Sequence, residues 1–323
     1  MRIVLALGGN ALVPEGERGT WEEQLAHAMP AARAAAALHR AGHEVLLTHG
    51  NGPQVGALAL QQAAGEPDEP AMPFDVLAAM TQGQVGYLLQ LALWTVDPTI
   101  PTAVVLSRVR VDREDPSFAL PSKPIGPFYA EAQALTLAAD RGWRVGPDAG
   151  RGWRRMMPSP RPLQILELIH IRTLAESGAL VIALGGGGIP VAVQRGRPLG
   201  VEAVVDKDRA SAELACAIGA DLLIMLTGVA RVALDYGTRW QRDLARLTVS
   251  DARRHLAAGD FPAGSMGPKI ESAARFAETG GTAIVTSVDR AVGAVEERDG
   301  TWIVADAAGP SRVASAEVPA MRA

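Results

Sequence analysis

Short apolar runs bordered by glycine-rich turns, with longer helical stretches between them, constrain the fold of this chain most strongly. Five such runs occur, at residues 3–7, 45–48, 180–184, 222–226 and 283–286. Continuous apolar runs of this length suit strands that are buried on both faces, as in a mainly parallel sheet. We therefore expect an open α/β sheet whose strands are connected by helices that cover it.

The stretches between the runs are typical of helices. Thr20 and Glu23 form the sequence of a capping box, which opens a helix that should end at Gly42. Pro30 lies inside this stretch and predicts a kink or a break into two helices. Further helices are expected at residues 74–94, 162–177 and 208–218.

Two regions interrupt this alternation. Residues 108–160 are rich in proline, glycine and arginine and have helical periodicity only at 131–139. We expect a small protruding subdomain there, of the kind that often acts as a lid. Residues 305–323 have no periodicity and are expected to form a frayed tail. We therefore interpret residues 1–323 as one α/β domain that carries a lid.

Composition excludes several classes of protein. A single cysteine, Cys216, excludes a disulfide framework and a cysteine-based zinc site. The net charge of −4 argues against a nucleic-acid partner. The first apolar run is too short for a signal peptide, and no apolar stretch reaches the roughly 18 residues that span a bilayer. We expect a cytoplasmic protein that has no membrane partner.

Three glycine-rich turns follow predicted strands, and in open α/β sheets ligands bind at that edge. Glycines let backbone N–H groups approach anionic oxygens, so three such turns at one edge indicate an anion site, although any one of them alone also fits a plain connection. The phosphate-binding patterns of Walker ATPases and of standard dinucleotide-binding proteins are absent. The turns contain Gly8, Gly9 and Asn10, then Gly50, Asn51 and Gly52, and then Gly185 and Gly186.

Lysine is scarce. The chain has three lysines, Lys123, Lys207 and Lys269, against 28 arginines. An ammonium group is a compact charge that can follow a moving phosphoryl group, which gives a reason to keep lysine at these positions. The alternative is that all three are solvated surface lysines.

Two predicted helix starts accompany these lysines. Asp206 and Asp208 flank Lys207, where they would orient lysines or simply cap the helix. The second start precedes Lys269 and is expected to offer free N–H groups to a phosphate. It contains Gly264, Ser265, Met266 and Gly267. His49, beside the second glycine turn, is interpreted as a structural histidine.

Several of these blocks together resemble carbamate kinases, which are members of the amino-acid kinase family. The resemblance follows the family's order over roughly residues 3–304. It is carried by GGN at 8–10, HGNGPQVG at 49–56, KPIGPFY at 123–129, GRGWRR at 150–155, PSP at 158–160, residues 185–190 and 200–208, and GSMGPK at 264–269.

The resemblance implies an eight-stranded open sheet between helix layers, a homodimer, and reversible phosphoryl transfer between ATP and carbamate in arginine metabolism, running toward ATP. Mg²⁺ would be carried by the nucleotide phosphates and not by protein ligands. The implied catalytic residues are Lys123, Lys207, Lys269 and Asp206. Carbamate or carbamoyl phosphate would bind at Gly8, Gly9, Asn10, Gly50, Asn51 and Gly52. The nucleotide would bind at Gly185, Gly186, Asp208, Thr227, Gly264, Ser265, Met266 and Gly267.

The sequence also departs from the family. Most amino-acid kinases have a lysine where this chain has Ala6. The resemblance to carbamate kinases implies that Lys123 replaces it, which separates this chain from acetylglutamate, uridylate and aspartate kinases. Near the nucleotide base, the family's Asp, acidic residue and Tyr are replaced by Gly228, Ala230 and Ala233. We expect weaker base selection there, unless Trp240 fills the space of the missing Tyr.

Two other functions stay open at this point. One is an amino-acid kinase that uses another small acid, which the size of the acceptor site at Gly50, Asn51 and Gly52 would distinguish. The other is a non-catalytic family member kept for binding or assembly. The presence of all three lysines and all glycine blocks argues against the latter.

Overall fold

A computed structural model of the chain describes residues 1–14, 16–65, 69–148, 152–262, 264–296 and 299–306. Its centre is an eight-stranded sheet in which β16 and β17 form the one antiparallel pair, so that β17 and its parallel neighbour β15 run opposite to the other six strands. This confirms the expected open, mainly parallel sheet. In spatial order the strands are β15 (Arg246–Thr248), β17 (Thr301–Val304), β16 (Thr282–Ser287), β12 (Leu222–Thr227), β1 (Arg2–Leu7), β2 (Glu44–His49), β9 (Leu180–Ile182) and β3 (Thr102–Val104).

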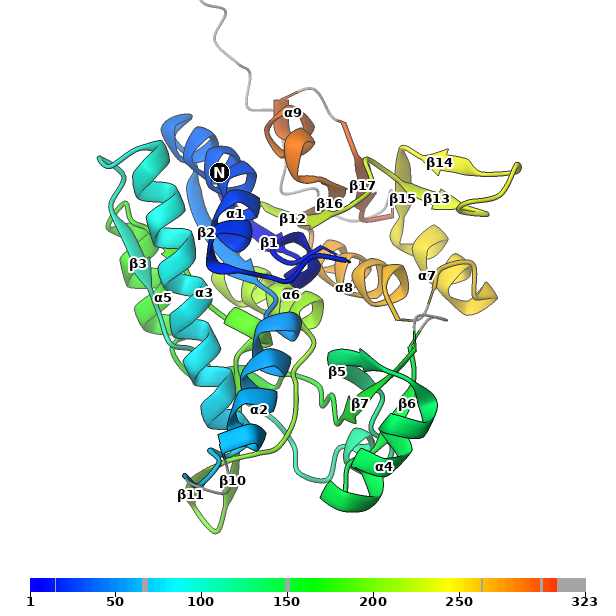
Figure 1. Cartoon of the computed structure of the whole chain (residues 1–323). Helices are drawn as coiled ribbons and strands as arrows, with labels where there is room; N and C mark the ends of the chain where they lie inside the picture. The colour runs from blue at the N-terminus through cyan, green and yellow to red at the C-terminus, as the bar shows by residue number, and fades with distance from the viewer. Residues whose placement is uncertain (15, 66–68, 149–151, 263, 297–298, 307–323) are drawn as a thin grey trace, which may run out of the picture.

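All five apolar runs of the sequence became strands of this sheet, and both faces of the sheet are covered by helices (Figure 1). Alternate residues of β1 show the two layers, because Ile3 and Leu5 pack into one core and Val4 and Ala6 into the other. One layer contains α1 (Trp21–Arg40), α3 (Phe74–Val96) and α9 (Ala291–Glu296). The other contains α5 (Leu168–Glu176), α6 (Lys207–Ile218), α7 (Val249–Ala258) and α8 (Met266–Glu278).

Two expectations about helices were wrong in part. Of the kink or break expected at Pro30, the break does not occur, because α1 continues from Trp21 to Arg40 through it. The capping box at its start is present, and the buried alanine face of α1 packs in the same core as α3, so tertiary packing outweighs the missing N–H. The helix expected at 162–177 begins only at Leu168, because β8 (Gln164–Ile165) pairs with β4 (Arg108–Arg110) before it.

Smaller sheets extend the edge of the domain that carries the glycine turns. β4 and β8 join β10 (Ile189–Gln194) and β11 (Arg197–Gly200) in a four-stranded sheet, and β10 and β11 form a hairpin. β13 (Val232–Leu234) and β14 (Arg242–Leu244) form a separate hairpin. The helix α2 (Gly52–Gly65) follows β2 directly.

A three-stranded sheet and one helix protrude from the domain and are here called the lobe (Figure 1). The lobe consists of β5 (Lys123–Tyr129), α4 (Glu131–Arg141), β6 (Val145–Pro147) and β7 (Trp153–Met157). It falls inside the stretch 108–160 in which we expected a protruding subdomain, whereas β4 at the start of that stretch pairs with β10 in the main body. Residues 149–151 of that stretch, and 307–323 of the expected tail, lie outside the described residues.

No helix in the part of the chain that the structure describes is both long and apolar enough to cross a membrane.

Candidate active site

The glycine turns that follow β1 and β2 touch one another at the carboxyl end of the sheet. A Cβ atom on Gly50 would lie 2.6 Å from the backbone nitrogen of Gly9, so the two turns approach as closely as only glycine permits. The turn after β9 joins them, because a Cβ atom on Gly186 would lie 2.3 Å from Nδ2 of Asn51. Gly8 faces the end of β12, with Leu226 O 3.7 Å from where its Cβ would be. The structure therefore brings the predicted turns together.

The side chain of Asn51 is buried and its Nδ2 donates a hydrogen bond of 2.8 Å to Oγ1 of Thr81. This hydrogen bond ties the turn after β2 to α3. The side chain of Asn10, expected beside it, lies outside the described residues, as do Gly150 and Arg151 of one family block.

Sequence reasoning missed two residues that support these turns, Thr81 and Gln82 on α3. Gln82 is buried, and its Nε2 donates to Gly185 O at 2.9 Å while its Oε1 accepts from Ser107 N at 2.8 Å. The sequence did contain a signal for them, because they are two adjacent polar residues on the apolar face of the helix predicted at 74–94. Polar groups that are buried are normally hydrogen-bonded, so such a pair indicates a structural role.

His49 lies beneath the same turns and has the structural role that the sequence indicated. Its Nδ1 is 3.0 Å from Gly50 O, and a Cβ atom on Gly185 would lie 2.5 Å from its Nε2. Burial lowers the pKa of His49 from 6.5 to about 4, so the imidazole is neutral at physiological pH.

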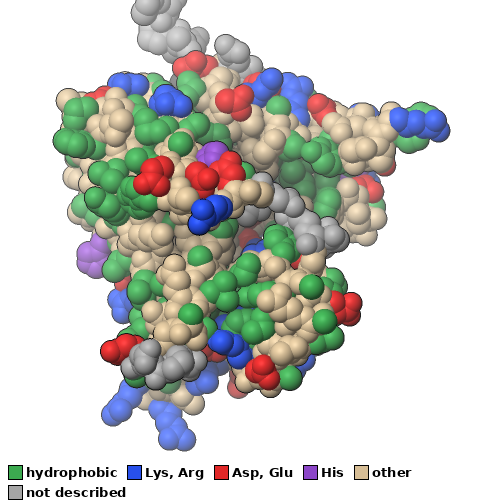
Figure 2. Space-filling model, viewed as in Figure 1, with side chains coloured by type: hydrophobic (Ala, Val, Ile, Leu, Met, Phe, Trp, Pro, Cys, Tyr) green, Lys and Arg blue, Asp and Glu red, His purple; other side chains and the backbone are tan. Residues whose placement is uncertain are grey.

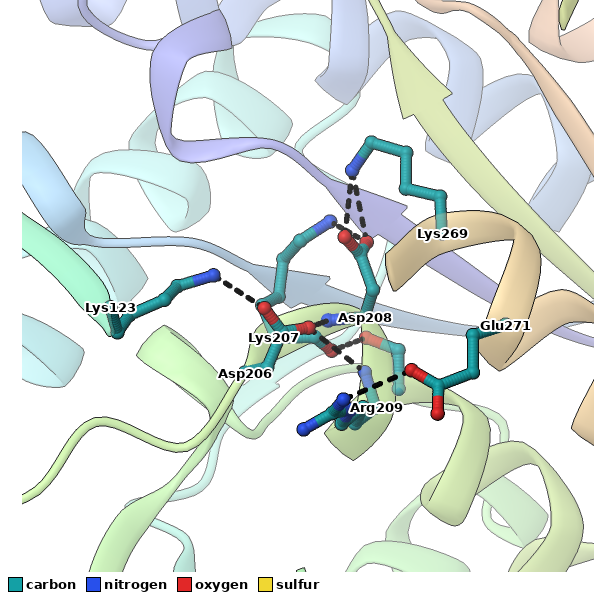
Figure 3. A network of polar contacts seen from close by, with 8 residues as sticks. Lys123, Asp206, Lys207, Asp208, Arg209, Lys269 and Glu271 are labelled. Atoms are coloured by element: carbon teal, nitrogen blue, oxygen red, sulfur yellow. Dashed lines mark hydrogen bonds and ion pairs between the residues drawn. The ribbon is translucent and has the colours of Figure 1, made fainter. Parts of the chain in front are cut away.

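The three lysines converge around the first turn of α6 (Figure 3). Nζ of Lys269, on α8, lies 2.8 and 3.1 Å from the two carboxylate oxygens of Asp208. Nζ of Lys207 lies 2.8 Å from Oδ1 of the same carboxylate. These three residues are here called the buried ion cluster, because their side chains are only 8–13% exposed.

Opposite charges compensate one another within this cluster. Although burial alone would raise the pKa of Asp208, Lys207 and Lys269 hold it well below its usual range. Burial lowers the pKa of Lys207, and Asp208 opposes that effect. The approach of Lys207 to Asp208 lacks hydrogen-bond geometry, and its Nζ has no hydrogen-bond partner among the described residues. An anionic oxygen at this position would supply one.

Asp206 connects the third lysine to the same helix. Its Oδ1 accepts hydrogen bonds from the N–H groups of Asp208 and Arg209, at 2.9 and 3.2 Å, which caps α6. Its Oδ2 forms an ion pair with Nζ of Lys123, which reaches it from β5 of the lobe (Figure 3). Asp206 therefore both caps the helix and holds a lysine, the two roles that the sequence left open.

The second predicted helix start is arranged differently from the expectation. The N–H groups of Ser265 and Gly267 donate to the carbonyl of Pro262, at 3.2 and 2.9 Å, and are not free for a phosphate. α8 nevertheless begins at Met266 and projects Lys269 into the buried ion cluster. Gly264 has open space around it.

Comparison with known proteins places this arrangement in a family. The model of the amino acid kinase family matches residues 1–287. The chain belongs to the amino acid kinase family. It is 47% identical to a carbamate kinase of Thermococcus kodakarensis over 311 residues, which cover 94% of this chain and 99% of that protein. It is 45% identical to carbamate kinase 2 of Enterococcus faecalis over 293 residues, covering 88% and 93%.

Solved structures agree with this assignment. A carbamate kinase from Giardia lamblia bound to AMP-PNP is 40% identical and has a TM-score of 0.86, with 94% of this chain and 98% of that chain covered. A structure of carbamate kinase from the same organism bound to citric acid has a TM-score of 0.89 at 40% identity and the same coverage. The eight-stranded sheet is thus the sheet of the amino acid kinase family.

In this amino acid kinase, Trp240, the candidate for the space of the missing tyrosine, is largely exposed. Trp240 is 67% exposed at the turn that joins β13 to β14, where its ring lies 4.5 Å from the guanidinium of Arg239. Ala233 is buried within β13 itself. Gly228, just past Thr227 at the end of β12, has open space around it.

Proposed function

We propose that this chain is a carbamate kinase, which transfers a phosphoryl group reversibly between ATP and carbamate and runs toward ATP. The main support for the proposal is that Lys123, Lys207 and Lys269 converge on the glycine-lined end of the sheet. Relatives named carbamate kinase match it over nearly their whole length and support the choice of carbamate as the acceptor.

The chemistry needs positioning and charge neutralisation more than covalent help. In the ATP-forming direction, an oxygen of the ADP β-phosphate attacks phosphorus, the bond from phosphorus to the carbamate oxygen breaks, and carbamate leaves with the electron pair. In the reverse direction carbamate is already an anion, so no general base is required. The main obstacle is repulsion between two anions, which lysines and backbone N–H groups reduce.

The residues divide this task by position. Lys207 and Lys269 would neutralise the nucleotide phosphates and the transferred group, together with the turn at Gly185 and Gly186. Lys123 would approach the transferred group from the acceptor side, above the turns at Gly9 and Gly50. Asp206 and Asp208 would orient the lysines, as their ion pairs indicate.

Mg²⁺ fits this site as part of the nucleotide substrate. Both carboxylates near the lysines are engaged in ion pairs, and the described residues contain no group of three or more His, Cys, Asp or Glu side chains that could hold a metal ion. The nucleotide phosphates would therefore supply the metal's ligands, as MgATP or MgADP.

A coupled assay for ATP formation from ADP and carbamoyl phosphate tests the proposal. We expect ATP formation with carbamoyl phosphate and at least ten-fold lower kcat/KM, in order of magnitude, with acetyl phosphate. A preference for acetyl phosphate would indicate another small acid as the acceptor. The absence of ATP formation from a folded protein that still binds ADP would indicate a non-catalytic member of the family.

We also propose that the protein is a homodimer that pairs through α3 and the sheet edge beside it. Met80, Tyr87 and Trp94 lie on one face of α3 and are 45%, 56% and 66% exposed. Trp21 of α1 stacks on Tyr87 with ring centroids 5.8 Å apart. β3, the edge strand of the eight-stranded sheet, lies next to α3 (Figure 1), and hydrophobic side chains gather on that side of the molecule (Figure 2). An apolar stripe beside an open sheet edge is typical of an interface between copies.

Light scattering on the wild type and on Trp94→Glu tests this assembly. We expect the mass of a dimer for the wild type and of a monomer for the variant. A monomeric wild type would contradict the assignment of this surface.

A further inference from the structure

The contact between the lobe and the main body determines where Lys123 can reach. Lys123 and Ile125 on β5, and Arg155 and Met157 on β7, are cross-strand partners, with Lys123 opposite Met157 and Ile125 opposite Arg155. Residues two apart on a strand point to the same side, so these four side chains share one face of the three-stranded sheet.

That face packs against α2 and the beginning of α3. Ile125 and Met157 are buried in a small apolar cluster with Val55 of α2 and with Phe74 and Leu77 of α3. This cluster is separate from the two large cores of the domain. The backbones also meet directly, because a Cβ atom on Gly56 of α2 would lie 2.1 Å from Cα of Gly126.

Arg155 is the charged residue at this junction. Its guanidinium carbon lies 4.8 Å from the ring centre of Trp143, within the lobe, and 5.8 Å from the ring centre of Phe74, in the main body. Its side chain is 18% exposed and lies 3.9 Å from the carboxylate of the exposed Glu202. A guanidinium between two aromatic rings, one from each part, joins the parts by cation–π attraction in a partly desolvated place.

We propose that Arg155 is a positioning residue that holds the lobe against α2 and α3, so that Lys123 is delivered to the phosphoryl-transfer site. Arg155 itself does not touch the reacting atoms and acts through Lys123. The cross-strand partner of Arg155 is Ile125, and Lys123 lies two residues before Ile125 on β5. This inference rests on the proposed function, because it assigns Lys123 its part in phosphoryl transfer.

Arg155→Met tests the proposal, with Arg141→Met as the matched control. Arg141 also lies over the ring of Trp143, at 5.5 Å, but is exposed at the end of α4, so its loss removes a similar contact within the lobe only. We expect kcat for ATP formation to fall about ten-fold in Arg155→Met, to be unchanged in Arg141→Met, and the KM for ADP to be nearly constant in both.

A double mutant separates positioning from general stability. If Arg155 acts through Lys123, adding Arg155→Met to Lys123→Ala should lower kcat by less than about two-fold further. An equal loss in both backgrounds, or no loss in the single variant, overturns the proposal. Gly56→Ala should force α2 and β5 apart without changing any charge. We expect it also to lower kcat in the wild type and to lower it little further in Lys123→Ala. It replaces Arg155→Met if that variant does not fold.

Hydrogen exchange provides a readout that does not depend on activity. We expect faster exchange at residues 52–65 and 123–129 in Arg155→Met than in the wild type and Arg141→Met. Unchanged exchange there overturns the positioning role even if ATP formation falls. A wild type that forms no ATP overturns the proposed function alone, since the exchange comparison still decides whether Arg155 holds the lobe.

Discussion

The buried ion cluster and the lobe supply lysines to the same site in different ways. Lys207 and Lys269 share Asp208 and stand on helices that pack into a large core, with side chains 11% and 13% exposed. Lys123 is 33% exposed and comes from a three-stranded sheet that the small apolar cluster joins to the body. Two of the lysines thus belong to the main body, and the third belongs to the lobe.

We infer from this difference that the site can hold phosphates firmly and still bind and release the small acid that accepts the phosphoryl group. Asp208 is buried and paired with both lysines, so neither lysine can move away without leaving part of that charge uncompensated. We propose that Lys207 and Lys269 therefore define a fixed place for phosphate. Lys123 stands on the lobe, which joins the main body through the small apolar cluster and the contact of Arg155 with Phe74, and we propose that it can withdraw with the lobe as a unit. The predictions below test this division.

The largest expected effect is on stability, at the carboxylate that the two fixed lysines share. Asp208→Asn leaves the ammonium of Lys207 buried without its main counter-charge, and loss of one partner of a buried pair costs about 3–5 kcal/mol. Asp206→Asn should cost about 1 kcal/mol or less, because asparagine also caps helices and Lys123 can reach water. Urea unfolding of both variants measures this. Equal losses of unfolding free energy in the two variants would mean that burial and ion pairing do not distinguish Asp208 from Asp206.

The next effect is on turnover. Lys269→Ala should lower kcat by at least ~10²-fold, which is the scale of losing one preorganised donor to the transition state. The protein should still fold, since Asp208 retains Lys207 as a partner. Steady-state assays with a thermal melt as the control measure both. A folded Lys269→Ala enzyme with nearly normal turnover would remove this lysine from the mechanism.

A pH effect is expected from His49 beneath the glycine turns. Its pKa is about 4 in the folded protein against 6.5 when unfolded, so the unfolded chain binds more protons between these values. Stability from this group is therefore complete above pH 6.5 and is lost as the pH falls toward 4, by about 3 kcal/mol in total. Urea unfolding from pH 7.5 to 4.5 should show a shallower dependence for His49→Gln. Identical slopes would contradict a buried neutral imidazole.

The smallest expected effect is on selection of the nucleotide base, because the three lysines are proposed to bind phosphates and not the base. Stacking of a base on an aromatic side chain is worth on the order of 1–3 kcal/mol on single strands, and Ala233 provides no ring. We expect kcat/KM to favour ADP over GDP by less than about ten-fold, and Trp240→Ala to change this little because Trp240 is exposed. A strong preference for ADP that persists in Trp240→Ala would mean that other contacts select the base.

The sequence predicted the repeating, local part of this molecule well. Apolar runs located five strands, and the scarcity of lysine indicated the three residues that converge at the site. What it could not predict depends on long-range pairing. β8 replaced the start of a predicted helix because β4 was there to pair with it, and Pro30 was accommodated by packing within the core that contains α1 and α3.

The same limit applied to the site. Gln82 supports Gly185 from a helix 103 residues earlier in the chain, and Gly56 meets Gly126 across the lobe contact, so the local sequence did not predict these partners. Two of the N–H groups expected to be free before Lys269, those of Ser265 and Gly267, donate to the carbonyl of Pro262 in a local turn that glycine and proline spacing alone did not specify.

Hydrogen exchange with and without ligands tests the division between fixed and delivered lysines most directly. Carbamoyl phosphate and a nonhydrolysable nucleotide, added together, should slow exchange within residues 115–160 as the lobe closes on the ligands. Exchange in α6 and α8 should change little, because the buried ion cluster is already in place. Calorimetry should first verify that both ligands bind. If exchange in the lobe then does not change, Lys123 is as fixed as Lys207 and Lys269, and the proposal that the lobe delivers this lysine is wrong.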